Sequence, residues 1–264
     1  RHYGDNPVGG TILSLLSQNE DGSVSAKHAW TSSAEFVATQ NHLLFSRISR
    51  EGYAVETESI AAFSFDDLAQ CIASVGTDSF ESPYPEDLRP EEYADTVFHI
   101  NMQRVLLSAA ESSDGYAMVF SDILQDEESS SGSELLVSFG NDATKRAEVQ
   151  LPLDNSSNSG VSIGRNGCIA VRSSISIGTA QGAQGLAKTA FYDSETLEAK
   201  QSLIAATTSI GSWTSDGSWI DIGRSITNTM NGAGSPLEDE SNPMEGPLIH
   251  YVLTEPIDTP KTDS

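Results

Sequence analysis

Short runs of β-branched and aromatic residues, each closed by Gly, Asn, Asp or Ser, recur along almost the whole chain. Such runs are typical of β-strands, and the residues between them are those that tight turns use. Helical periodicity is nearly confined to residues 66–73 and 90–94, where each segment is long enough for only a turn or two. The pattern therefore predicts an all-β protein.

The expected strands alternate with polar turns from one end of the chain to the other. Asn19-Glu20-Asp21-Gly22-Ser23 predicts a hairpin turn, because Asp-Gly suits the positive φ of such turns. We expect two strands within 35–46, and single strands over 10–18, 24–30, 59–65, 71–75, 96–101, 104–109, 116–124, 134–139, 147–153, 160–163, 168–177, 187–192, 199–206, 218–222 and 248–253. Residues 1–254 are expected to form a single all-β domain, and residues 255–264, with two prolines, a disordered tail.

One arrangement recurs loosely: a strand, a turn centred on Asn or Asp with Gly, and a returning strand. It is found at residues 164–172 and 214–222. Residues 190–198, Ala-Phe-Tyr-Asp-Ser-Glu-Thr-Leu-Glu, resemble the outer hairpin of a β-propeller blade. The chain thus resembles β-propeller proteins of the exported or cell-envelope type, which implies about four to six irregular blades. A β-sandwich is the alternative fold, because the same short strands would build one.

The charge of the chain restricts its partners. Lys and Arg total 14 against 38 for Asp and Glu, which gives a net charge of −24. Such a surface repels phosphate backbones and anionic lipid headgroups, so we expect neither nucleic-acid binding nor direct electrostatic binding to membranes. A protein partner fits this composition better.

The composition also favours a location outside the cytoplasm. Ser, Thr, Gly and Asn are abundant and Lys is scarce, and the chain begins at Arg1 rather than at Met. We expect a secreted or cell-envelope protein from which an N-terminal signal or lipid anchor has been removed.

The two cysteines, Cys71 and Cys168, lie in similar apolar runs. In an oxidising compartment they could form a disulfide, which would stabilise the fold by about 4 kcal/mol on the chain-entropy model. The alternative is two separately buried thiols that pack as small apolar residues. Neither cysteine has a second Cys or a His at metal-ligand spacing, so they do not predict a metal site.

The sequence contains no catalytic motif. It has no Gly-x-Ser-x-Gly elbow, and the Gly-rich stretch at 178–185 lacks the Lys and the helix of a phosphate-binding loop. The five histidines are widely spaced, and the paired carboxylates lie in loops away from aromatic clusters. No cofactor is expected; calcium bound by an acidic loop is the one ion that such oxygens would suit.

Trp213 and Trp219 flank an Asp-Gly turn, so their rings are expected to meet across a hairpin. They could form either an exposed interaction surface or a buried structural pair.

Together, the features of the sequence predict a non-catalytic extracytoplasmic interaction protein, an accessory subunit or docking module of a cell-envelope complex. The alternatives are a carbohydrate- or metal-binding module, and a hydrolase or lyase whose site assembles only in three dimensions.

Overall fold

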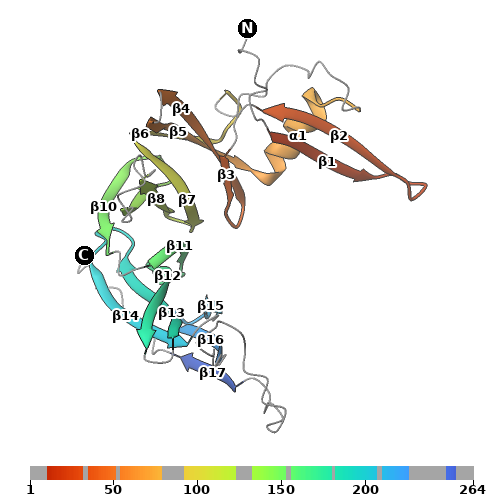
Figure 1. Ribbon diagram of the computed structural model, residues 1–264. Helices are drawn as coiled ribbons and strands as arrows, with labels where there is room; N and C mark the ends of the chain where they lie inside the picture. The colour runs from red at the N-terminus through yellow and green to blue at the C-terminus, as the bar shows by residue number, and fades with distance from the viewer. Residues whose placement is uncertain are drawn as a thin grey trace. The chain divides into compact units, whose positions relative to one another are not determined.

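The computed structural model describes residues 11–31, 35–51, 54–78, 92–122, 133–152, 156–179, 182–206, 210–225 and 248–253. Within these ranges the chain forms β-strands and a single α-helix (Figure 1). In chain order the elements are β1 (Thr11–Gln18), β2 (Val24–Thr31), β3 (Glu35–Ala38), β4 (His42–Glu51), β5 (Ala54–Ser64), α1 (Phe65–Val75), β6 (Thr96–Met102), β7 (Arg104–Glu111), β8 (Gly115–Asp122), β9 (Glu134–Gly140), β10 (Lys145–Leu151), β11 (Ser156–Ile163), β12 (Cys168–Thr179), β13 (Gly182–Asp193), β14 (Ala199–Ala206), β15 (Ile210–Trp213), β16 (Trp219–Ser225) and β17 (Leu248–Leu253).

The strands form small antiparallel sheets, each built from strands that are consecutive in the chain. Strands β3–β6, β7–β10 and β11–β14 give three four-stranded sheets, β15–β17 a three-stranded sheet, and β1–β2 a two-stranded ribbon. Short polar turns join several of these neighbours and favour the pairing of consecutive strands, whereas α1 lies between β5 and β6 and residues 226–247 separate β16 from β17. The all-β prediction is confirmed, and a sandwich-like stacking of sheets is compatible with it.

The helix corrects one sequence prediction. Residues 66–73 were expected to be helical and are, but residues 71–75, predicted as a strand, continue the same helix. Ser64 caps the start of the helix, because its Oγ accepts a hydrogen bond from the N–H of Asp67 at 3.1 Å. Leu68, Cys71 and Ile72 then lie on one buried face at helical spacing, and this burial outweighs the strand preference of the apolar run.

Three tight turns share one construction, at Asn19–Ser23, Gly164–Cys168 and Thr214–Ser218. In each, the first residue donates its N–H to the carbonyl of the fifth at 2.8–2.9 Å, and the fourth residue is a glycine with φ between 72° and 84°. The third residue is Asp or Asn, and its side chain accepts the N–H of the fifth. The predicted Asp-Gly hairpin turn is therefore confirmed, and two later turns repeat it.

The chain divides into two compact units. Unit 1 comprises Arg1–Leu106, Asp122–Glu128 and Asn141–Thr144, and unit 2 comprises Leu107–Ser121, Ser129–Gly140 and Lys145–Ser264. The predicted single-domain range of 1–254 stays a prediction, and its tail at 255–264 lies outside the described residues.

One hydrophobic cluster of unit 1 lies between the ribbon β1–β2, the helix and the sheet β3–β6. Its buried side chains are Ala29, Phe45, Phe63, Leu68, Cys71 and Ile72. The rings of Phe45 and Phe63 meet edge to face with centroids 5.8 Å apart. One face of the ribbon is thus anchored on the helix, as Figure 1 shows.

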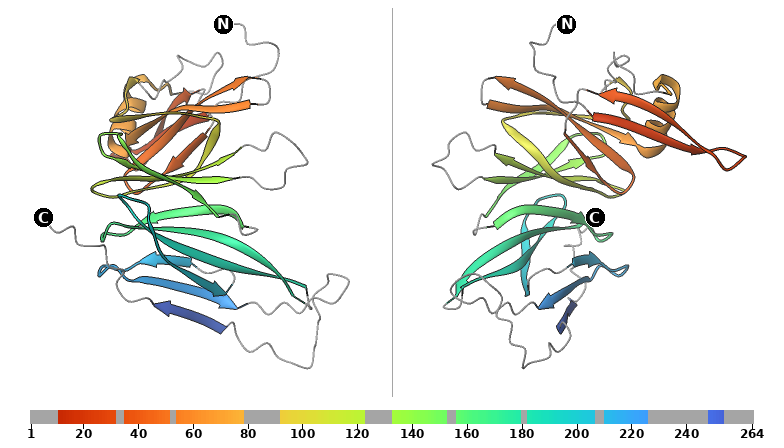
Figure 2. Two further views of the ribbon diagram at one scale, coloured as in Figure 1. Left: turned by 90° about the vertical axis from the view of Figure 1, so that its left-hand side faces the viewer. Right: turned by 45° about the vertical axis from the view of Figure 1, so that its right-hand side comes forward.

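Among the described residues of unit 2, two hydrophobic clusters each lie between successive sheets. The first joins the sheet β7–β10 to the sheet β11–β14 through Ala117, Val119, Leu136, Leu151, Ile169, Val171, Tyr192 and Leu197. The second joins β11–β14 to β15–β17 through Cys168, Ala170, Phe191 and Trp219. Figure 2 shows the sheet β15–β17 lying beside the sheet β11–β14. Alternate residues along β12 supply the two cores, because successive side chains of a strand point to opposite faces.

No helix among the described residues has the length and apolar character needed to cross a membrane.

Candidate functional site

The predicted tryptophan pair lies in the second core of unit 2. Trp213 ends β15 and Trp219 begins β16, and the two are direct cross-strand partners with ring centroids 5.2 Å apart. Phe191 of β13 contacts both rings edge to face, each at 5.6 Å. Trp219 is only 2% exposed. The cross-strand contact is confirmed, and the aromatic cluster of Phe191, Trp213 and Trp219 packs two sheets together; an interaction surface at this pair stays a prediction.

The two cysteines lie in different units, and both are buried thiols. Cys71 is in α1, whereas Cys168 begins β12 and packs against the aromatic cluster. Burial raises the pKa of the Cys71 thiol, and burial also raises the pKa of the Cys168 thiol despite the neighbouring Lys200. Since the thiolate is the nucleophilic form, neither side chain has the character of an activated cysteine. The predicted disulfide stays a prediction.

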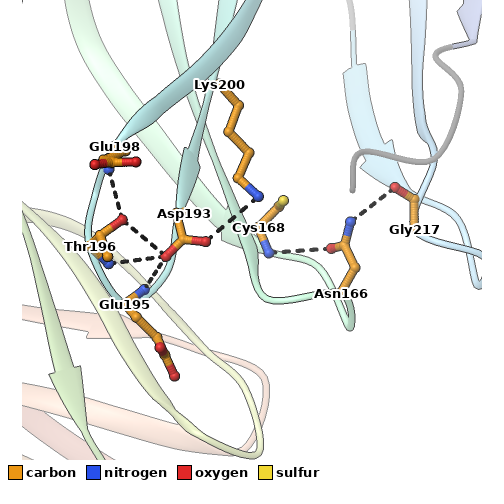
Figure 3. Close-up of polar contacts among 8 residues, drawn as sticks. All are labelled: Asn166, Cys168, Asp193, Glu195, Thr196, Glu198, Lys200 and Gly217. Atoms are coloured by element: carbon orange, nitrogen blue, oxygen red, sulfur yellow. Dashed lines mark hydrogen bonds and ion pairs between the residues drawn. The ribbon is translucent and has the colours of Figure 1, made fainter. Parts of the chain in front are cut away.

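The sequence did not point to Lys200, which lies beside Cys168 and Asp193 (Figure 3). Its Nζ is 3.6 Å from the Asp193 Oδ2, and both side chains are largely buried. Asp193 ends β13, and its Oδ1 accepts the N–H of Glu195 at 2.9 Å and that of Thr196 at 3.0 Å. The Asp193 carboxylate therefore both closes the turn to β14 and forms an ion pair with the Lys200 ammonium.

These contacts decide the ionisation of Asp193. Burial acts to raise the pKa of this carboxyl, but the N–H groups of Thr196 and Glu195, together with the Lys200 ammonium, outweigh it and hold the pKa below its ordinary value. Asp193 is therefore ionised at neutral pH and is not a general acid.

Three turns of unit 2 are joined to one another, and we call them the turn cluster: Gly164–Cys168, Asp193–Glu198 and Thr214–Ser218. Asn166 accepts the Cys168 N–H at 3.3 Å and donates its amide to the Gly217 carbonyl at 3.3 Å (Figure 3). The Ser194 N–H donates to the Gly167 carbonyl at 3.0 Å. One asparagine thus links a turn of the sheet β11–β14 to a turn of the sheet β15–β17.

Glycine is required where these turns approach each other. Gly217 has φ of +84°, and a Cβ there would lie 3.0 Å from Asn166 Nδ2. A Cβ on Gly164 would lie 2.8 Å from a ring carbon of Trp213. Gly164 and Gly217 therefore serve the packing between turns, and Gly217 also serves local turn geometry.

Asp216 belongs to the Thr214–Ser218 turn and is likewise used internally. The Thr214 hydroxyl and the Ser218 N–H donate to its Oδ1, the latter at 3.1 Å. These two hydrogen bonds, led by that from Thr214, hold the pKa of Asp216 below its ordinary value. Asp193 and Asp216 are thus both ionised, and each accepts N–H groups of its own turn.

The groups of the turn cluster have the properties of structural residues that join turns. A general acid–base pair needs two groups whose pKa values are driven apart, whereas Asp193 and Asp216 are both held ionised. Within the described ranges, no three His, Cys, Asp or Glu side chains come together as potential metal ligands. A calcium site in an acidic loop stays a prediction.

Sequence reasoning identified the Asn166 and Asp193 turns but not what they contact. Phe191 and Lys200 were missed as partners of Trp213 and Cys168. Phe191 carried a signal, because an aromatic residue next to a turn and in register with a strand end is typical of inter-sheet packing.

No family model matches the chain, and no curated protein matches it in sequence.

Proposed function

We propose that this protein is a non-catalytic extracytoplasmic interaction protein, an accessory subunit or docking module of a cell-envelope protein complex. The observation that carries the proposal is the exposure of large apolar side chains on the ribbon β1–β2. Leu16 and Val24 are each 67% exposed, and Ile12 is 40% exposed. The register of the ribbon places these three side chains on one face, and exposed apolar side chains grouped on one face are typical of a binding site for another protein.

The turn cluster supports the non-catalytic part of the proposal. Asp193 and Asp216 bind backbone N–H groups of their own turns, the Cys168 thiol is buried, and the rings of the neighbouring aromatic cluster pack against each other. The carboxylates are thereby committed to turn structure, and the thiol and the rings to the packing of two sheets. A hydrolase or lyase would require these same groups to be released towards a substrate.

We further propose that the sheets are blades of an irregular β-propeller. Three successive four-stranded meanders followed by a three-stranded one are the repeat that such a fold uses. The shared cores between successive sheets of unit 2, and the repeated Asx-Gly turns, support the same proposal. A β-sandwich is the alternative.

The net charge of −24 supports a protein partner over nucleic acid or an anionic membrane surface. We place the protein outside the cytoplasm, secreted or held at the cell envelope by an N-terminal lipid anchor. In that setting an acidic, serine-rich surface keeps the protein soluble while the apolar ribbon binds its partner.

A carbohydrate-binding module is the second candidate, because Trp213 and Trp219 could stack on sugar rings. This candidate ranks lower, since Trp219 is buried and both rings contact the ring of Phe191. A metal-binding module would need oxygens that the turns now use for their own N–H groups.

The proposal is tested by purifying the tagged full-length chain from the envelope fraction of its source in mild detergent. Quantitative mass spectrometry of the eluate should give one partner protein at near-stoichiometric amount, retained through size-exclusion chromatography. An untagged strain is the matched control. Recovery of the chain alone, at every detergent strength that leaves other envelope complexes intact, would refute an accessory-subunit role.

A further inference from the structure

The ribbon β1–β2 has one anchored and one outward face. Leu13, Leu15 and Ala29 belong to the core of unit 1 with the helix. Side chains alternate along a strand, so the residues between them point the other way. The outward face, which we call the ribbon face, consists of four cross-strand pairs: Ile12–Trp30, Ser14–His28, Leu16–Ala26 and Gln18–Val24.

The hydrogen bonds of His28 reveal where the main chain of β1 points. His28 exchanges two backbone hydrogen bonds with Thr77, both of 2.9 Å, on the side of β2 away from β1. His28 and Ser14 are therefore a non-hydrogen-bonded pair within the ribbon. Because such pairs alternate with hydrogen-bonded pairs, the N–H and C=O groups of Ile12, Ser14 and Leu16 point outward from the edge of β1.

This edge is available for pairing in the part of the chain that the structure describes, where β1 pairs with β2 alone. Natural proteins usually block such an edge with a lysine, a proline or a bulge. Strand β1, Thr-Ile-Leu-Ser-Leu-Leu-Ser-Gln, has neither of those residues, and its register with β2 is continuous. Ile12 and Leu16 therefore each combine outward-pointing main-chain groups with an exposed apolar side chain.

Charge distinguishes between the kinds of polypeptide segment that could pair with this edge. The ribbon face carries no Asp, Glu, Lys or Arg, although the chain has a net charge of −24. Glu20 and Asp21 lie at the tip of the ribbon, and the hydroxyl and N–H of Ser23 hold the pKa of Asp21 below its usual range. A second copy would bring a like net charge, whereas a segment with cationic residues at one end would complement the tip.

We propose that the edge of β1 binds an extended segment of another polypeptide, which adds as an antiparallel strand. This segment lays alternate apolar side chains on the ribbon face and places Lys or Arg at its N-terminal end, opposite Glu20 and Asp21. Main-chain hydrogen bonds to Ile12, Ser14 and Leu16 supply the pairing, and the apolar side chains supply selectivity. The inference rests on the proposed interaction function and names the chemistry of its partner.

A synthetic peptide tests the recognition chemistry directly. The probe is an N-acetylated ten-residue peptide that begins with two lysines and continues with alternating valine and threonine; the control peptide begins with two glutamates. Titrated into the isotope-labelled full-length chain, the lysine peptide should shift the amide resonances of Ile12, Ser14 and Leu16 to saturation. It should bind about two- to fivefold more tightly than the glutamate peptide, as expected for exposed charge pairs.

Two charge variants separate the tip from general acidity. In the double variant Glu20→Gln and Asp21→Asn, the preference for the lysine peptide should disappear, whereas Asp142→Asn, which removes a carboxylate from another Asx turn, should leave it unchanged. Saturable shifts that avoid β1, equal binding of both peptides, or concentration-dependent shifts of β1 without peptide would each overturn the proposal. The last of these would identify a second copy as the occupant.

The native partner distinguishes failure of this inference from failure of the proposed function. Leu16→Glu should abolish recovery of the stoichiometric partner, and Ser17→Glu, an equal charge on the next residue of β1, should retain at least half of it. If Leu16→Glu still recovers the partner, the docking surface is wrong and the interaction function stands. Circular dichroism spectra superimposable on wild type establish that both variants are folded.

Discussion

The two glycines that occupy equivalent turn positions should respond differently to the same substitution. Gly22 and Gly217 have φ of +82° and +84°, so alanine meets the same left-handed strain at both. The difference is the neighbourhood. Among the described residues nothing lies within 4 Å of a Cβ at Gly22, whereas at Gly217 three atoms of Asn166 lie at 3.0–3.2 Å.

The expected magnitudes follow from these contacts. Left-handed alanine costs about 1–2 kcal/mol, offset by about 0.4–1 kcal/mol from the lower entropy of its unfolded chain. Gly22→Ala should therefore cost about 1 kcal/mol in free energy of unfolding. Gly217→Ala adds an overpacking term of about 1–3 kcal/mol, because Asn166 is held by hydrogen bonds and cannot move away freely.

Urea denaturation followed by far-UV circular dichroism and tryptophan fluorescence measures both costs. Since the two glycines lie in different units, Gly217→Ala is also made in an Asn166→Ala background, which removes the amide group and leaves only the Cβ of residue 166 near Gly217. There the additional cost should fall to within about 1 kcal/mol of that at Gly22. Equal costs for the two single variants, or an additional cost unchanged by Asn166→Ala, would refute the account of the turn cluster.

Four further predictions concern single side chains. Ala143→Gly should stabilise the protein by up to about 1 kcal/mol in urea denaturation, because Ala143 has φ of 61°; a loss of stability would contradict this strain. Because the pKa of Asp193 is lower in the folded state, its carboxylate stabilises the fold fully above pH 3.8, the ordinary pKa, and this stability is lost as the pH falls through the folded pKa. Asp193→Asn should therefore flatten the pH dependence of the melting temperature in that range. Trp219→Ala should cost about 3–5 kcal/mol in unfolding free energy, and a cost below about 1 kcal/mol would show that the ring is not a core element. Ellman's reagent should detect Cys71 and Cys168 only after unfolding, whereas detection of neither in denaturant would establish a disulfide.

The strands were predictable because their signals are local. Alternating apolar residues and an Asp-Gly turn place β1 and β2 to within one residue at each end, whereas β15 (Ile210–Trp213) was not among the expected strands. The helix was only partly predictable, since its last residues have strand-like composition and become helical by burying one face with Phe45 and Phe63. Tertiary packing decided between the two readings of the same residues.

The contacts of the turn cluster could not be derived from the sequence. Asn166 and Gly217 are 51 residues apart, and their hydrogen bond exists only because two sheets stack at that point. Lys200 follows Asp193 closely in the chain, yet an ion pair there depends on the turn that brings β14 back beside β13. The cross-strand meeting of Trp213 and Trp219 was predictable, because a hairpin alone produces it.

Hydrogen–deuterium exchange on the native complex, compared with the isolated chain, tests most directly the claim that this is an interaction protein that docks through β1. The account predicts that the partner slows exchange at the outward amides of Ile12, Ser14 and Leu16 and leaves the turn cluster unchanged. Slowed exchange confined to the turn cluster, with β1 exchanging as in the isolated chain, would contradict it.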